Sequence, residues 1–116
     1  MLPNRVKLTK KSTDKLRYLK SKTGLTPNIL SRIAIMLTIK EGSDLANAGV
    51  GAFDGGQELN DTTLFGENIN AYDVMINQYI HDNRIKLTVN DTIIAMVEVG
   101  VHKMGHVKNL TQLASL

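Results

Sequence analysis

The sequence predicts a mainly α fold, a compact single domain of four to five helices with a short N-terminal strand or arm. The chain has 116 residues, of which 42% are hydrophobic, and this is enough for one core but too little for two domains. Apolar side chains recur at helical spacing in four segments with capping signals, whereas a convincing two-residue alternation occurs in one segment. We divide the domain into a basic strand-helix-helix part (residues 1–41), a glycine-rich acidic excursion (42–69) and a helical part (70–116).

The first element is predicted to be extended. In residues 5–9 the apolar Val6 and Leu8 alternate with polar side chains, which places both on one face of a strand. The pattern Asn-Arg-(Val/Ile)-Lys-Leu-Thr occupies residues 4–9 and again residues 83–88, each time before a capped helix. We therefore expect the two copies to be extended segments that pair.

A first helix follows this strand. Ser12 is a suitable N-cap and Gly24 a suitable end. Between them, Leu16 and Leu19 form a narrow apolar stripe. Residues three or four positions apart lie along one edge of a helix, and such an edge can follow a phosphate backbone. Here that edge carries Lys11, Lys15, Tyr18 and Lys22.

The second helix is marked by Thr26 as N-cap, Pro27 at the first helical position and Gly42 at its end. Its apolar residues cover more than one face. A helix of this kind is central in the core, or is shared between the core and a partner subunit. Together with the last long helix, it indicates that more than one chain is needed to cover the apolar surface.

Residues 42–69 are predicted to form a long excursion, in which Ser43 can cap a single helical turn through Ala46 and residues 58–59 can be briefly extended. Because so long a loop is uncommon in a small domain, we expect it to contain further structure. A third helix is predicted from an Asn70 cap to about residues 81–83.

Residues 84–89 should then form a short extended connector. The fourth helix is predicted to begin after a cap at Asn90 or Asp91 and to end at Gly105. Residues 110–116 can add a frayed C-terminal turn. With the three helices before it, this helix completes the mainly α domain.

Charge is distributed unevenly along the chain. Residues 1–40 contain ten lysines and arginines against one acidic residue, whereas residues 41–116 contain four against ten, and the formal net charge is +3. Positive potential concentrated in one part of a molecule attracts a polyanion and steers its approach. Ordinary solvated lysines are the alternative interpretation of this basic block.

Several kinds of catalytic or metal site are disfavoured. The chain has no cysteine, and therefore no thiol nucleophile, thiolate metal site or disulfide. His102 and His106 have helical i, i+4 spacing, but no third ligand is evident and Gly105 weakens the helix between them. The glycine-rich residues 49–56 are followed by Gln57 and Glu58 rather than by the lysine and hydroxyl residue of a phosphate loop. The acids of residues 54–73 have no regular ligand spacing.

We therefore expect no enzyme activity, no cofactor and no metal. Surface histidines near a helix C-terminus, turn glycines and a solvated acidic face explain these three features more simply.

Nucleic-acid binding is the function that the residues favour. We expect eight side chains to contact DNA: Arg5, Lys7, Lys10, Lys11, Lys15, Arg17, Lys20 and Lys22. Because this block contains one aromatic residue, Tyr18, the base stacking used by single-strand binders is poorly supported. We therefore expect contacts to the backbone of a duplex with little sequence recognition.

The order strand, helix, helix in residues 1–41 is that of a ribbon-helix-helix module, in which paired strands from two subunits enter a groove. In that arrangement Arg5, Lys7 and Thr9 would face DNA. A transcriptional regulator or antitoxin that recognises a specific operator is therefore one alternative function. A pure assembly scaffold, whose lysines contact an acidic partner protein, is another.

The overall pattern of the chain resembles one known family. It combines residues 5–9, residues 24–28 with Arg32, residues 55–60 (Gly-Gly-Gln-Glu-Leu-Asn) and a helix that ends in residues 102–105 (His-Lys-Met-Gly). With its length, this pattern is similar to the DndE family of DNA sulfur modification proteins. The resemblance spans nearly the whole chain, although no single motif is diagnostic.

The resemblance implies a small non-catalytic subunit of the bacterial machinery that replaces a non-bridging phosphate oxygen of DNA with sulfur. It further implies a mainly α fold related to ribbon-helix-helix proteins, self-association and DNA binding. We expect the oligomer, a dimer or a tetramer, to hold a DNA duplex that is intact, distorted or nicked. The expected protein partners are the sulfur-transferring and ATPase components of that system.

The N-terminal residues lack a signal-peptide pattern, and no stretch approaches the ~18 consecutive apolar residues of a membrane span. We therefore expect a soluble, unprocessed cytoplasmic protein without a membrane partner.

Overall fold

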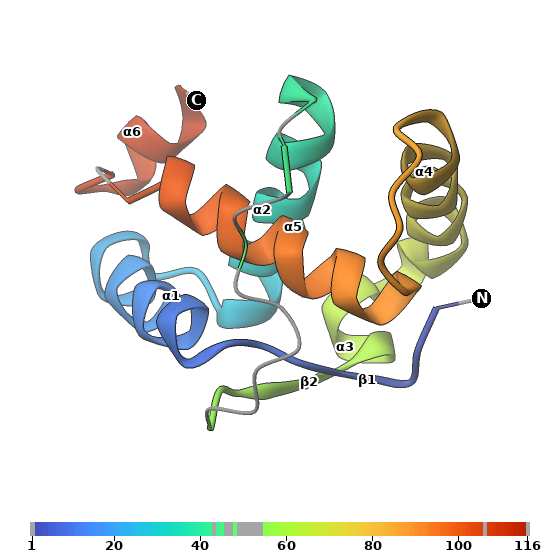
Figure 1. Ribbon diagram of the computed structural model, residues 1–116. Helices are drawn as coiled ribbons and strands as arrows, with labels where there is room; N and C mark the ends of the chain where they lie inside the picture. Colours follow the sequence, from blue (N-terminus) through green and yellow to red (C-terminus); the bar gives the residue numbers. More distant parts are fainter. Residues whose placement is uncertain (1, 43, 46–47, 49–54, 106, 116) are drawn as a thin grey trace.

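The computed structural model describes residues 2–42, 44–45, 48, 55–105 and 107–115 (Figure 1). Within them lie two short strands, six α-helices and one 3-10 turn, so the mainly α single domain with an N-terminal strand is confirmed. The elements are β1 (Arg5–Lys7), α1 (Lys10–Thr23), α2 (Pro27–Glu41), β2 (Glu58–Asn60), α3 (Asp61–Phe65), η1 (Gly66–Asn68), α4 (Ile69–Asp82), α5 (Val89–Lys103) and α6 (Leu110–Ala114).

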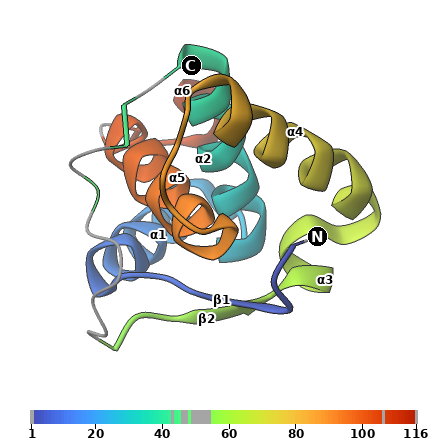
Figure 2. The same cartoon turned by 45° about the vertical axis from the view of Figure 1, so that its right-hand side comes forward.

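The centre of the domain is the crossing of α2 and α5, with α1 and α4 on opposite sides of it (Figures 1 and 2). The two backbones approach closely because Gly100 of α5 packs directly against the backbone of Ala34 in α2. Beside this crossing, the buried hydroxyl of Thr38 donates a hydrogen bond to the carbonyl oxygen of Met96 at 2.9 Å. The crossing explains why α2 is apolar on more than one face, since α1, α3 and α5 all pack against it.

The N-terminal strand pairs within its own chain. β1 is antiparallel to β2, with Val6 opposite Leu59 and both side chains buried. A backbone hydrogen bond of 2.8 Å from Leu8 to Gln57 extends the ladder. A β-carbon on Gly56 would overlap the carbonyl group of Leu8, so only glycine fits beside this strand. The expected extended piece at residues 58–59 is thus confirmed as part of β2.

The expectation that residues 5–9 pair with residues 84–88 is wrong. Arg84 has a left-handed φ of 52°, which interrupts an extended strand, and the segment that follows contains no strand. The side chains of Ile85 and Leu87 are instead packed as partly buried residues against the core. The shared sequence pattern therefore serves two different local structures.

The helix boundaries predicted from the sequence are confirmed where only one residue is suited to cap the helix end. Thr26 caps α2 by accepting from the Ile29 amide at 3.3 Å, and Gly42 ends the helix with a left-handed φ of 62°, both as expected. The predicted caps of α1 and α5 are wrong by a few residues. The threonine Thr9 caps α1 in place of Ser12, and Thr88 caps α5 in place of Asn90 or Asp91.

The expected excursion, residues 42–69, contains the further structure that its length indicated. Besides β2, it includes α3 and η1, which lead directly into α4, so the predicted Asn70 cap lies one residue inside a helix that begins at Ile69. Leu64 and Phe65 of α3 are buried in the core, and the Phe65 ring lies 5.0 Å from that of Tyr72. The predicted turn from Ser43 to Ala46 and most of the glycine-rich motif lie outside the described residues.

Candidate nucleic-acid interface

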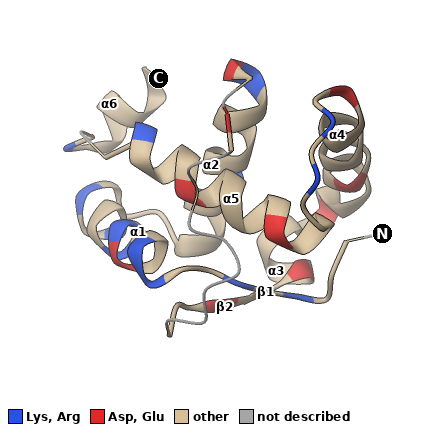
Figure 3. Cartoon of the chain, viewed as in Figure 1, with Lys and Arg blue, Asp and Glu red and all other residues tan. Residues whose placement is uncertain are grey.

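The eight cations predicted to contact DNA lie on α1 and β1. Six are exposed, and the other two, Lys7 and Lys15, are partly buried. Figure 3 shows blue residues along α1 and β1, and red residues on α3, α4, α5 and β2. The basic block of the sequence is therefore displayed mainly along α1, because β1 lies beside an acidic part of β2. Whether these side chains contact DNA stays a prediction.

On α1 the cations occupy two flanks rather than one face. The buried side of the helix carries Ser12, Thr13, Leu16 and Leu19. Since successive residues advance by about 100°, the remaining positions separate into two groups on either side of the outward direction. We call Lys11, Lys15, Tyr18 and Lys22 the Tyr18 flank, and Lys10, Arg17 and Lys20 the Arg17 flank. The predicted edge of four residues is thus confirmed as one of the two.

The Tyr18 flank forms a continuous surface. Lys11, Asp14, Lys15 and Tyr18 line one shallow hollow of about 350 Å³. The ammonium group of Lys22 lies 5.6 Å from the centre of the Tyr18 ring, within the range of a cation–π contact. Within the described part of the chain, Lys11, Lys15 and Lys22 form no ion pair with an acidic residue, so their charges remain available to an external anion.

The Arg17 flank is less strongly positive. The Arg17 guanidinium lies 3.5 Å from the Asp14 carboxylate, one turn away, with both side chains more than half exposed. Such an exposed pair contributes little stability, but the carboxylate offsets part of the positive charge next to it. The two flanks therefore offer a phosphate backbone different local charge.

The basic residues of β1 face acids across the small sheet. Lys7 lies opposite Glu58 in the register, and the Arg5 guanidinium is 3.9 Å from the Glu58 carboxylate. Figure 3 shows a red segment of β2 beside the blue of β1. Because opposite charges alternate here, β1 is a weaker anion site than the sequence suggested.

The C-terminal end of α5, where the sequence predicted surface histidines, lies beside α1. The Lys15 ammonium reaches the neighbourhood of Gly105, which follows α5. His102 and Lys103 are exposed in the last turn of α5. Lys108 is exposed just before α6, which packs against α1. Their clustering depends on contacts between segments about 90 residues apart, so spacing along the chain gave no signal for it.

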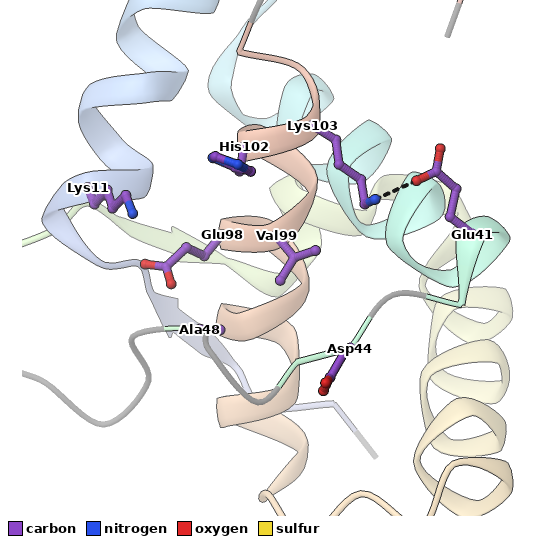
Figure 4. Close-up of a pocket in the computed structure, with 8 residues that line it drawn as sticks. All are labelled: Lys11, Glu41, Asp44, Ala48, Glu98, Val99, His102 and Lys103. Carbon is purple, nitrogen blue, oxygen red and sulfur yellow. Dashed lines mark ion pairs between the residues drawn. The ribbon is translucent and has the colours of Figure 1, made fainter.

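A cleft of about 530 Å³ lies along α5, between Lys11 of α1 on one side and the end of α2 with the segment after it on the other (Figure 4). Lys11 and Glu98 point toward one another across it, and His102 lies above them. Glu98 accepts a hydrogen bond of 3.0 Å from the Thr9 hydroxyl, and Lys103 forms an ion pair of 2.6 Å with Glu41. Because the cleft contains both signs of charge, its floor is not an anion site, and a phosphate would favour the outer edge of α1.

The described residues contain no group of three or more histidines, cysteines or acids that could hold a metal ion. His106, the second member of the histidine pair, lies outside the described residues, as does Asp54 among the candidate acids. Among the described helices, none has both the length and the hydropathy needed to cross a bilayer.

Two tyrosines are titratable groups in the interior, away from the basic flanks. Burial raises the pKa of Tyr72, while the nearby Arg32 charge acts in the opposite direction. Burial also raises the pKa of Tyr79, and the negative charge of Asp44 raises it further. Both phenols are thereby kept neutral, as expected of core residues rather than of acid–base groups.

The outer side of α2 carries an apolar groove. Residues of α2, together with Tyr72 and Leu113, line a depression of about 680 Å³. Met36 on its rim is 40% exposed, which is unusual for a large apolar side chain. Arg32 also lines the groove, and its buried Nε has no hydrogen-bond partner among the described residues. This surface agrees with the prediction that one chain leaves part of the apolar surface of α2 exposed.

Two solved structures are similar to this chain along most of its length. The crystal structure of DndE from Escherichia coli B7A, involved in DNA phosphorothioation modification, is similar with a TM-score of 0.71 and 28% identity. A DndE mutant with two glycine-to-lysine changes, also involved in DNA phosphorothioation, is similar with a TM-score of 0.72 and 26% identity. Each match covers 90% of this chain and 99% of the other. No curated protein matches significantly.

The family model for DNA sulphur modification protein DndE matches residues 5–112, which includes β1, all the long helices and both flanks of α1. The match therefore covers almost the whole chain and confirms the resemblance that the sequence suggested. This chain belongs to the DndE family of DNA sulphur modification proteins.

Proposed function

We propose that this protein is a non-catalytic DNA-binding subunit of the machinery that introduces sulfur into the DNA backbone. It holds the duplex through the Tyr18 flank of α1, and the sulfur chemistry takes place in other subunits. The observation that carries the proposal is the set of three lysines, Lys11, Lys15 and Lys22, that lie along one edge of α1 and form no ion pair among the described residues. The Arg17 flank and β1 contribute less, because Asp14 and Glu58 stand beside their cations.

Lysines suit contacts to the backbone better than recognition of sequence. An ammonium group is a point charge on a flexible stem, which pairs with a phosphate in many orientations. Each phosphate that is neutralised releases counterions, and the logarithm of the binding constant then falls with the logarithm of salt concentration with a slope of about −0.9 per contact. Binding through this surface should therefore be strongly dependent on salt and weakly dependent on sequence.

A homo-oligomer, a dimer or a tetramer, would place several copies of this flank around one duplex, intact or nicked. The exposed Met36 and the apolar groove of α2 support self-association, because surface of this kind is normally covered in an assembly. The other expected partners are the sulfur-transferring and ATPase components of the same cytoplasmic machinery.

Two triple variants of equal charge change test the proposal. One is Lys11→Gln/Lys15→Gln/Lys22→Gln on the Tyr18 flank, and the other is Lys10→Gln/Arg17→Gln/Lys20→Gln on the Arg17 flank. Binding to a duplex is measured by fluorescence anisotropy at several salt concentrations. The first variant should make the salt slope shallower by up to about 3, from three contacts of about 0.9 each. The second variant should change the salt slope less. Equal changes of the slope in the two variants would contradict the assignment of DNA binding to the Tyr18 flank.

The same titration separates the alternatives. A pure scaffold, in which the lysines contact an acidic protein, predicts no binding to DNA by the purified chain. A regulator that recognises an operator predicts very different affinities for unrelated duplexes. The geometry of the sheet does not favour this second alternative, because β1 pairs with β2 of its own chain and Glu58 lies beside the two cations that would enter the groove.

A further inference from the structure

We propose that Tyr18 is a stacking platform for a single unpaired base, so that the protein prefers DNA in which one base has left the helical stack. This inference rests on the proposed DNA binding and assigns a specific role to one aromatic side chain within it. It names the ligand as an unstacked nucleobase, whereas the lysines around it contact phosphates.

Tyr18 differs from the other aromatic residues that the structure describes. Phe65, Tyr72 and Tyr79 are buried in the core, whereas Tyr18 is 39% exposed. The other large apolar side chains with comparable exposure, Met36, Val74 and Leu110, are not aromatic. Within the described residues the exposed ring is thus found at the position where the unpaired lysines are concentrated.

The surroundings of the ring offer contacts to a base as well as to its phosphates. The hollow beside it is lined by Lys11, Lys15 and Asp14. The Asp14 carboxylate can accept a hydrogen bond from a ring or amino N–H group of a base, while the ammonium groups of Lys11 and Lys15 can pair with neighbouring phosphates. Lys22, 5.6 Å from the centre of the ring, stands where it can pair with the phosphate of the same nucleotide. An aromatic ring flanked by cations is the combination that binds single nucleotides by stacking and charge together.

A single ring limits the ligand to one base. In an intact duplex the faces of the bases are covered by their neighbours, so Tyr18 has nothing to stack on and only the lysines act. Proteins that bind long single strands use a succession of aromatic side chains, and α1 has one. The preferred DNA is therefore a duplex with one displaced base rather than an extended single strand.

The test uses three DNA probes of the same sequence: an intact duplex, a duplex with one bulged nucleotide, and the same bulge with an abasic residue. The abasic bulge is as flexible as the other but has no base to stack, so the ratio of the two affinities measures stacking. The protein variants are Tyr18→Phe, which keeps the ring, and Tyr18→Leu, which keeps an apolar side chain without it. Binding of the full chain is measured by fluorescence anisotropy, after circular dichroism has confirmed the fold of each variant.

The native protein and Tyr18→Phe should bind the bulge that contains a base about 5- to 150-fold more tightly than the abasic bulge, the range that stacking on one aromatic residue gives. Tyr18→Leu should lose this preference and bind the two bulges with equal affinity. Equal affinity of the native protein for the two bulges, or a preference that survives in Tyr18→Leu, would overturn the inference while leaving DNA binding intact. Failure to bind any of the three probes would instead refute the proposed function, and the inference with it.

Discussion

Replacement of Gly100 by alanine tests whether the close crossing of α2 and α5 determines the stability of the domain. A β-carbon on Gly100 would lie 2.5 Å from both Cα and Cβ of Ala34 and still closer to its carbonyl oxygen. These neighbours are largely backbone atoms of a buried helix, which cannot rotate away as the end of a flexible side chain could. The two helices must therefore move apart to accommodate the new methyl group.

Two opposing effects set the magnitude. In the interior of a helix, alanine is more favourable than glycine by up to about 1 kcal/mol. Overpacking a well-packed core costs about 1–3 kcal/mol, and the backbone contact places Gly100 toward the upper part of that range. We therefore expect Gly100→Ala to reduce the free energy of unfolding by about 1–2 kcal/mol, although helix propensity alone would increase it.

Urea denaturation followed by circular dichroism measures this difference. The matched control is Ala71→Gly at an exposed position of α4, where propensity acts without a packing contact and the loss should be no more than about 1 kcal/mol. The decisive result is the sign of the change in the free energy of unfolding caused by Gly100→Ala. If alanine there raised the urea midpoint, the helices would not be in the close contact that the structure describes.

Three further predictions concern the interior and one exposed ion pair. Thr38→Val should lower the free energy of unfolding by about 1–2 kcal/mol, because it removes the buried hydrogen bond to Met96. Thr38→Ser keeps that bond, so its stability should change mainly through the lost methyl group. The urea midpoints of the two variants distinguish these effects. Glu41→Gln should lower the free energy of unfolding by less than about 1 kcal/mol in spite of the short contact to Lys103, since both side chains are partly exposed. The decrease, measured by urea denaturation, should be smaller still in 1 M salt. Burial raises the pKa of Tyr72 above the usual 10.0, so its contribution to stability is complete below pH 10 and is lost as the pH rises through the raised value. Tyr72→Phe should therefore show a smaller loss of stability at alkaline pH, and an equal loss would indicate that this phenol titrates normally in the fold.

Local signals in the sequence were sufficient to predict a helix end where neighbouring residues alone cap the backbone groups there. The start and end of α2 were predicted correctly because a Thr-Pro pair and a glycine act on the atoms next to them. The cap of α1 was misplaced because two hydroxyl residues compete for it. Thr9 takes the position since its hydroxyl also donates to Glu98, and that contact spans 89 residues and cannot be recognised from local spacing.

The candidate site shows the same division. The spacing of Lys11, Lys15, Tyr18 and Lys22 predicted that they share an edge, because the period of a helix is fixed by its own backbone. The weakening of β1 by Glu58 was not predictable, since it depends on which segment pairs with the strand. The exposure of Tyr18, which carries the further inference, also required the folded chain.

By itself, the sequence determined the helical class of the fold, the separation of charge between its two parts, and the edge of α1 on which lysines and a tyrosine align. These properties depend on covalent order and on interactions within one turn of a helix. Only the tertiary structure decided that β1 pairs with β2 rather than with the repeated segment before α5, and that the end of α5 lies beside α1. Both outcomes follow from burying Val6 against Leu59 and Gly100 against Ala34, contacts whose free energy appears only when distant segments meet in one core.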